Sequence, residues 1–233
     1  MKSAAKFSCP RCNTEVGKSF KFCPECGSYL QESLLVHRLI RALDYQRKGK
    51  SWEAMDQLKE LTEHDPQNAY VHKLLGNAYF HMGLLDWAIE SYRNAIVIDS
   101  QYIDAHYDLG VALYHRACVT EAISEYQTVL KLDPDYHAAH YRIGLCYHHV
   151  GKLNAAVHHL IEATAVTPEY VMAHYHLGVI YYKQNDLEKA ESEFRRVLAE
   201  DPQDTACAKY LDLIAQQRKN KHKEKQEERV KVE

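Results

Sequence analysis

The sequence predicts an all-α fold of five helix-turn-helix units, with a small cysteine-rich module before them and one helix after them. Residues 35–204 repeat with a period of 34 residues and need no gaps. Small and large residues recur at fixed positions of each period, and Gly, Asn or Pro mark the expected helix ends. A period of this length is typical of stacked helical hairpins.

The five units are 35–68, 69–102, 103–136, 137–170 and 171–204, and a position is counted from the first residue of each unit. Position 8 holds Gly76, Gly110, Gly144 and Gly178. Position 20 holds Ala54, Ala88, Ala122, Ala156 and Ala190. Position 24 holds the large residues Leu58, Tyr92, Tyr126, Leu160 and Phe194. Small residues let two helices approach closely, and the large residue fills the space beside them.

The expected ends of the helices also repeat. Position 15, between the two helices of a unit, holds Gly49, Gly83, Ala117, Gly151 and Asn185. Gly and Asn accept the left-handed conformation that ends many helices, whereas Ala117 is a poor residue there. Position 32 holds Pro66, Pro134, Pro168 and Pro202, and each proline pushes the preceding residue out of the helical region.

These positions resemble the tetratricopeptide (TPR) repeat over almost three quarters of the chain. The resemblance implies a right-handed superhelix over residues 29–204, with residues 205–233 as a capping helix and charged tail. The first unit departs from the pattern, with Arg41-Ala42 in place of a large residue and Gly, as expected of an end unit. We expect Trp52 and Leu58 to provide its packing.

Four cysteines in the first 26 residues predict a metal site. Cys9, Cys12, Cys23 and Cys26 form two CxxC pairs separated by ten residues. Two such turns supply the four sulfurs that tetrahedral Zn²⁺ takes. Structural zinc is favoured over a redox CxxC pair, which usually occurs alone, and over iron of the rubredoxin type, which accepts the same four sulfurs.

Residues 1–28 resemble a small zinc ribbon. The resemblance implies short strands within 14–22, with Val16, Phe20 and Phe22 covering the metal. About thirty residues cannot bury an adequate core, so we expect the metal to contribute most of the folding free energy of this module. At the other end of the repeats, we expect Asp204 to cap a last helix. This helix is expected to cover the fifth unit through Ala208, Leu211 and Ile214.

Composition places the chain among ordinary globular proteins. The net charge is −3, and 46% of the residues are hydrophobic. There is no apolar run long enough to span a membrane and no secretory signal, so a cytoplasmic location is expected. The basic excess at the two ends is too small to predict a nucleic-acid partner from charge alone.

The first helices of successive units line the concave face in the family that the repeats resemble. Positions 2, 5, 6, 9, 12 and 13 share that face, which is rich in Tyr and His and is expected to bind a peptide. The candidate partner-binding residues are Tyr70, Lys73, Asn77, His81, Tyr107, Asp108, Tyr114, His115, Tyr141, Arg142, His148, Tyr175, His176 and Tyr182. Alternatively, the tyrosines at position 5 pack against the next unit.

Two narrower interpretations of this face are disfavoured. TPR domains that bind the C-terminal carboxylate of chaperones use a specific set of Lys, Asn and Arg, but Asp108 and Ala138 replace two members of that set here. A metal site is not expected from the histidines at position 4, which pack between helices in the family. These are His72, His106, His140 and His174.

The sequence therefore predicts a non-enzymatic scaffold or adaptor that binds a partner protein in the TPR groove, with the zinc ribbon as a second docking face. The chain has no phosphate-binding Gly loop, no HExxH motif and no GxSxG motif. The alternative is a regulatory protein that associates with nucleic acid through its zinc ribbon. The sequence does not indicate the oligomeric state.

Overall fold

The computed structural model describes residues 6–9, 11–17, 23–26, 30–167 and 170–230. It divides into two compact units, residues 1–117 and 118–233, and each is taken by itself below. The third 34-residue period has its first helix in one unit and its second helix in the other.

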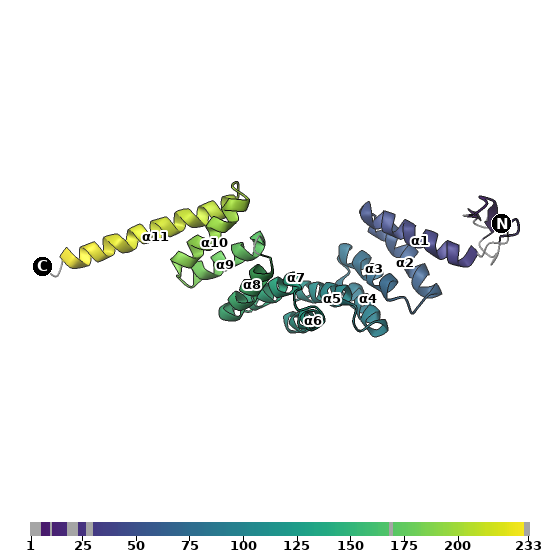
Figure 1. The fold of residues 1–233 in the computed structure, drawn as a ribbon, viewed down its shortest axis with the longest axis horizontal. Coiled ribbons are helices and arrows are strands. Elements are labelled where there is room, and N and C mark those ends of the chain that lie inside the picture. The colour runs from purple at the N-terminus through teal and green to yellow at the C-terminus, as the bar shows by residue number, and fades with distance from the viewer. Residues whose placement is uncertain (1–5, 10, 18–22, 27–29, 168–169, 231–233) are drawn as a thin grey trace. The chain divides into compact units, whose positions relative to one another are not determined.

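The unit of residues 1–117 begins with a two-stranded antiparallel sheet and continues with helices (Figure 1). The strands are β1 (Lys6–Ser8) and β2 (Glu15–Gly17), and Phe7 pairs with Val16. The helices are α1 (Leu30–Arg47), α2 (Ser51–His64), α3 (Ala69–His81), α4 (Leu85–Ile98) and α5 (Ile103–His115). One strand falls within the predicted 14–22, whereas Phe20 and Phe22 lie outside the described residues.

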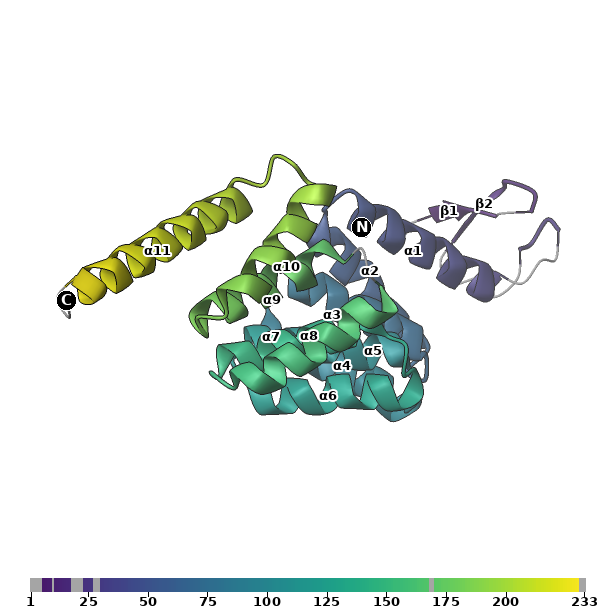
Figure 2. The same cartoon turned by 60° about the vertical axis from the view of Figure 1, so that its left-hand side comes forward.

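The unit of residues 118–233 is helical throughout its described residues (Figure 2). It contains α6 (Val119–Leu132), α7 (His137–His149), α8 (Leu153–Val166), α9 (Val171–Lys183), α10 (Leu187–Glu200) and α11 (Thr205–Val230). Within the units, α1 packs on α2, α3 on α4, α7 on α8 and α9 on α10 as helical hairpins, and consecutive helices of neighbouring periods also pack together. The predicted all-α architecture of helix-turn-helix units is confirmed.

Close approach in the second, fourth and fifth hairpins rests on the predicted small and large positions. An added Cβ at Gly76 would lie 2.5 Å from the ring of Tyr92, and one at Gly178 would lie 2.7 Å from the ring of Phe194. The alanines at position 20 are fully buried, and no large residue at position 24 is more than 2% exposed. The large side chain of one helix therefore occupies the space that a Cβ on the facing helix would need.

All five turns between the helices of a hairpin use the left-handed conformation. Gly49, Gly83 and Gly151 have φ of 70°, 74° and 76°, and Asn185 has φ of 61°. Ala117 has φ of 65° although its Cβ makes that region unfavourable. The repeat geometry therefore imposes the turn on a residue that does not prefer it.

The residues before the interhelical prolines leave the helical region, as predicted. Asp65 has φ −134° and ψ 78°, and Asp133 has φ −138° and ψ 96°. The amide of each still donates to a carbonyl of the preceding helix, that of Leu61 or Val129. Each helix is thus closed by a hydrogen bond at the residue where the proline stops it.

The first hairpin packs differently from the expectation in one respect. Leu58 is fully buried, as predicted, but the prediction for Trp52 was wrong because its side chain is 64% exposed. Ala42 is fully buried and fills the small position. Arg38 of α1 is also buried, and its guanidinium pairs with Glu60 of α2.

Helix α11 begins at the predicted cap, because the Asp204 carboxylate accepts a hydrogen bond of 2.8 Å from the amide of Cys207. Ile214 is 2% exposed and Leu211 packs against the core of the last hairpin, as predicted. Ala208 is exposed, so its predicted packing role was wrong, and the buried Cys207 takes that place. The helix continues to Val230 and projects beyond α10 (Figure 1).

Ala117→Gly should raise the free energy of unfolding by about 0.5–1 kcal/mol, because glycine adopts a positive φ without the clash of a Cβ. Gly83→Ala is the matched reverse change, since an added Cβ there meets no atom within 4 Å and only the backbone is strained. It should lower the same free energy by a similar amount. Urea denaturation measures both, and equal signs for the two variants would contradict the account.

Gly144→Ala should lower the free energy of unfolding by about 1–3 kcal/mol, because the new Cβ would lie 2.8 Å from the Leu160 side chain. Helix propensity alone predicts the opposite sign, a gain of about 1 kcal/mol. The sign of the change in a urea or thermal melt therefore decides whether close packing controls this position.

Candidate metal centre and partner-binding face

The first candidate site is the pair of CxxC turns. The Cys9 amide donates to the Thr14 carbonyl at 2.8 Å, and the Asn13 amide donates to the Cys9 carbonyl at 2.7 Å. Asn13 has φ of 63°, a conformation that Asn tolerates better than most residues. These bonds fold the first CxxC segment into a tight turn that follows β1 and precedes β2.

The four sulfurs converge as a metal site requires. The Sγ atoms of Cys9 and Cys26 are 3.6 Å apart, and those of Cys12 and Cys23 are 3.5 Å apart. All four lie within 4.8 Å of one another. A tetrahedron with metal–sulfur bonds of about 2.3 Å separates its sulfurs by about 3.8 Å, so the four cysteines fit a tetrahedral ion.

The surroundings of the sulfurs also fit a closed structural site. Cys9 is fully buried, Cys23 is 2% exposed, and Val16 packs against both. Burial raises the pKa of the Cys23 thiol to about 11, so a cation has to displace its proton. Val16 therefore has the covering role that the sequence predicted for it.

In the unit of residues 1–117, the predicted partner-binding residues lie on α3 and α5. The Lys73 ammonium forms an ion pair of 3.0 Å with the Asp108 carboxylate across these helices. Asn77 bonds the Tyr92 hydroxyl at 2.8 Å. Burial raises the pKa of Asp108, and the charge of Lys73 opposes that shift.

This ion pair explains why the chaperone-tail interpretation is disfavoured. Lys73 already has a carboxylate partner within the chain, so a peptide carboxylate would have to displace Asp108. Tyr70 is 44% exposed, and His81 and His115 are also exposed. Phe80 meets the ring of His115 edge to face at 5.5 Å. Exposed aromatic and imidazole groups therefore lie on the same helices as a neutralised ion pair. Tyr107 and Tyr114 are half-buried.

In the unit of residues 118–233, the predicted residues lie on α7 and α9. Tyr141 is only 7% exposed and belongs to the core between these hairpins. Its ring meets the rings of Tyr170 at 4.9 Å and His176 at 5.8 Å. This tyrosine packs against the next hairpin, which is the alternative that the sequence left open for position 5.

A cation and two imidazoles meet on the same face. The Lys183 ammonium donates to Nε2 of His148 at 2.9 Å, and the rings of His148 and His176 are 6.3 Å apart. Burial lowers the pKa of both histidines, that of His176 to about 4. Arg142 lies on α7 and is half-buried.

Part of the α9 face is covered by the last helix. Tyr182 meets the ring of Tyr210 on α11 at 5.4 Å, and Tyr175 meets it at 6.5 Å. Tyr210 also stacks on Phe194, with ring centroids 4.7 Å apart. The sequence did not predict the role of Tyr210, because this residue lies outside the repeats and the periodic pattern does not extend to it.

Two of the histidines at position 4 bond the loop that precedes their helix. Nε2 of His72 bonds the Pro66 carbonyl at 3.1 Å, and Nε2 of His106 bonds the Ser100 carbonyl at 3.2 Å. A carbonyl only accepts, so Nε2 carries the proton in both rings. These two histidines therefore join the start of a helix to the loop before it.

The other two histidines at position 4 face position 23 of their own hairpins. Nδ1 of His174 lies 2.5 Å from a carboxylate oxygen of Glu193, and both side chains are largely buried. Nδ1 of His140 instead lies 3.4 Å from Nδ1 of His159. Sequence reasoning missed Glu193 and His159, although both occupy position 23.

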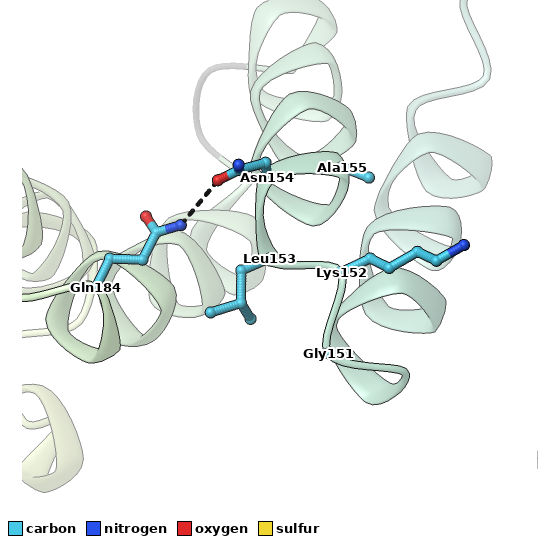
Figure 3. Close-up of a pocket in the computed structure, with 6 residues that line it drawn as sticks. All are labelled: Gly151, Lys152, Leu153, Asn154, Ala155 and Gln184. Carbon is cyan, nitrogen blue, oxygen red and sulfur yellow. Dashed lines mark hydrogen bonds between the residues drawn. The ribbon is translucent and has the colours of Figure 1, made fainter.

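A shallow pocket of about 400 Å³ lies at the turn between α7 and α8 (Figure 3). The side chain of Gln184 closes one side, because its Nε2 donates to Oδ1 of Asn154 at 3.1 Å. The described residues that line it include no Cys, His, Asp or Glu. The lining residues therefore supply no carboxylate, imidazole or thiol group, and none of them is a predicted site residue.

None of the described helices is both long enough and apolar enough to span a membrane.

Solved structures with the same architecture are repeat proteins. The chain is similar to MamA, with 26% identity over 69% of this chain and 94% of that chain and a TM-score of 0.66. MamA from Desulfovibrio magneticus RS-1 matches at 23% identity over 73% of this chain and 97% of that one, with a TM-score of 0.68. YrrB, a TPR protein with an unusual peptide-binding site, matches at 20% identity over 78% and 94%, with a TM-score of 0.64.

Sequence comparisons give the family. No curated protein matches the chain in sequence. A TPR-repeat model matches residues 76–115 and 119–151, and a tetratricopeptide-repeat model matches residues 149–205. A zinc-ribbon model matches residues 8–30. The two repeat models together cover more than half of the chain, so it belongs to the tetratricopeptide-repeat family and carries a zinc-ribbon domain before its repeats.

Proposed function

We propose that this protein is a non-enzymatic scaffold that binds a segment of a partner protein on the first helices of its repeats. The observation that carries the proposal is the grouping of exposed and half-buried aromatic, imidazole and charged side chains on α3 and α5 and, separately, of half-buried ones beside the exposed Lys183 on α7 and α9. Aromatic rings give a large contact area at low entropic cost, and their polar atoms fix the orientation of a bound chain.

The fold supports the same proposal. YrrB, which shares it, has a peptide-binding site. Stacked hairpins present one helix of each pair as a continuous row, and such rows suit an extended or helical peptide. The contributing residues in our proposal are the fourteen that the sequence predicted. Tyr141 supports the face from within the core, and Tyr175 and Tyr182 are shared with α11.

The zinc ribbon is proposed as a second docking face that a structural Zn²⁺ holds in shape. Its two strands have three residues each, and its buried cluster contains Cys9, Val16 and Cys23 with Cys26 packed against it. So small a core cannot offset the conformational entropy of folding without a metal. A role in catalysis would require an open coordination position, whereas four cysteine sulfurs complete a tetrahedron.

The purified full-length chain should contain one zinc ion, measured by elemental analysis, and should lack the visible absorption of a four-cysteine iron centre. Cys23→Ser should remove the zinc, because three thiolates and a hydroxyl hold it far more weakly. Cys118→Ser is the control, since Cys118 lies outside the cluster, at the start of α6. This variant should keep its full zinc content. Iron in place of zinc, or equal metal loss in both variants, would refute the zinc assignment.

Partner binding is tested with a triple variant of exposed residues, Tyr70→Ala with His81→Ser and His115→Ser. These changes leave the described core intact, so circular dichroism should show an unchanged fold while affinity capture with quantitative mass spectrometry shows at least tenfold less of the specific partners. Trp52→Ala with Trp87→Ala is the control, because these side chains are 64% and 58% exposed on α2 and α4, the second helices. Loss of the same partners only in the tryptophan variant would place binding on the second helices of the hairpins and contradict the proposal.

A further inference from the structure

A basic cluster on the α7–α9 face has an unusual composition. It consists of Lys183 with His148 and His176, and all three belong to the proposed partner-binding face or lie directly beside it. The Lys183 ammonium donates to Nε2 of His148 at 2.9 Å, so that nitrogen is unprotonated and the proton of this ring is on Nδ1. The ring of His176 lies near that of His148, with ring centroids 6.3 Å apart.

In the other unit, a lysine of the candidate face is neutralised by a carboxylate. There, Lys73 pairs with the carboxylate of Asp108, which occupies position 6 of its repeat. Position 6 of the fifth repeat holds His176 instead. The same place in the repeat thus supplies a counter-ion in one unit and a second basic group in the other.

The charges that act on the two imidazoles are all of one sign. Lys183 and His149 act on His148, while His148 and Lys183 act on His176. Every one of these interactions lowers the pKa, in addition to burial, which is the largest cause for both rings. No carboxylate is among the groups that shift either pKa in the described part of the chain.

Two tyrosine rings also lie beside His176. The hydroxyphenyl rings of Tyr141 on α7 and Tyr175 on α9 lie 5.8 Å and 5.4 Å from the His176 ring. They are neutral at physiological pH and do not supply a counter-charge. They do supply an apolar wall, in which a charge-assisted hydrogen bond is stronger than in open water.

We propose that Lys183, His148 and His176 form a binding subsite for a carboxylate of an acidic peptide segment of the partner. The charge complementarity is the reason for this occupant: a carboxylate accepts from the ammonium and from imidazole N–H groups, and it supplies the negative charge that the cluster lacks. The inference rests on the proposed function and specifies the chemistry of the segment that the α7–α9 face takes.

Binding of a carboxylate also gives the subsite a pH dependence with a defined sign. The negative charge stabilises the imidazolium forms, so the pKa of His176 in the complex lies above its value of about 4 in the free chain. The complex therefore takes up a proton. Its added stability is complete below the free pKa and declines as the pH rises through the pKa of the bound state.

The test uses the full zinc-loaded chain and a fluorescein-labelled hexaglutamate peptide, with hexaglutamine as the uncharged probe. Fluorescence anisotropy should give a dissociation constant for hexaglutamate at least tenfold lower at pH 5.5 than at pH 7.5. In carbon-13-labelled histidine spectra, saturating hexaglutamate should raise the pKa of His176 by about 2.5 units, the rise from about 4 that a tenfold difference in affinity between these two pH values requires. Equal affinity for hexaglutamine, or an unmoved His176 pKa, overturns the proposal.

Matched variants separate the subsite from the general charge of the protein. His148→Gln with His176→Gln should remove most of the pH dependence, whereas His64→Gln with His158→Gln removes two exposed imidazoles elsewhere and should leave it intact. Lys183→Gln should weaken binding at both pH values, and Lys152→Gln should not. Equal behaviour of the paired variants refutes the subsite.

The outcome is distinct from that of the partner-capture experiment. If partners depend on the α3–α5 face but hexaglutamate does not bind at His176, the scaffold function stands and the acidic specificity is wrong. If hexaglutamate binds as described but no partner depends on the first helices, the proposed function is wrong while the anion subsite is real.

Discussion

The close contact between a glycine at position 8 and a large side chain at position 24 is the constraint on which the second, fourth and fifth hairpins of this structure depend. It fixes how near the two helices of a hairpin lie, because Tyr92, Leu160 and Phe194 occupy the volume that a Cβ at the facing glycine would need. That distance in turn decides which side chains of the first helix reach the core and which remain at the surface. The packing at positions 8 and 24 therefore decides which side chains form the candidate partner-binding face, although the packing residues themselves do not belong to that face.

The sequence predicted most of the helical architecture, since periodic small, large and turn residues each report a local requirement. It predicted the metal cluster for a similar reason: two CxxC pairs close in sequence leave few ways to arrange four sulfurs. It failed for Trp52 and Ala208, which lie at the two ends of the array, where no neighbouring repeat supplies the usual packing surface. It also missed Tyr210, whose partner Phe194 is set by how α11 lies on the last hairpin.

The contacts on the candidate face were beyond the reach of sequence reasoning. Spacing placed Lys73 and Asp108 on the same side of their helices, but only their 3.0 Å separation shows that they neutralise each other. Likewise, Lys183, His148 and His176 come from two helices, and only the packing of those helices brings Lys183 within 2.9 Å of His148 and the two imidazole rings within 6.3 Å. The two units thus present the same kind of face with different charge balance.

The central claim is that a partner binds on the first helices of the repeats. Amide hydrogen exchange of the full chain, alone and in complex with a captured partner, tests it most directly because protection reports contact at each helix. The account predicts slower exchange in α3, α5, α7 or α9, with little change in α2, α4, α8 and α10. Protection confined to the second helices or to the zinc ribbon would contradict it.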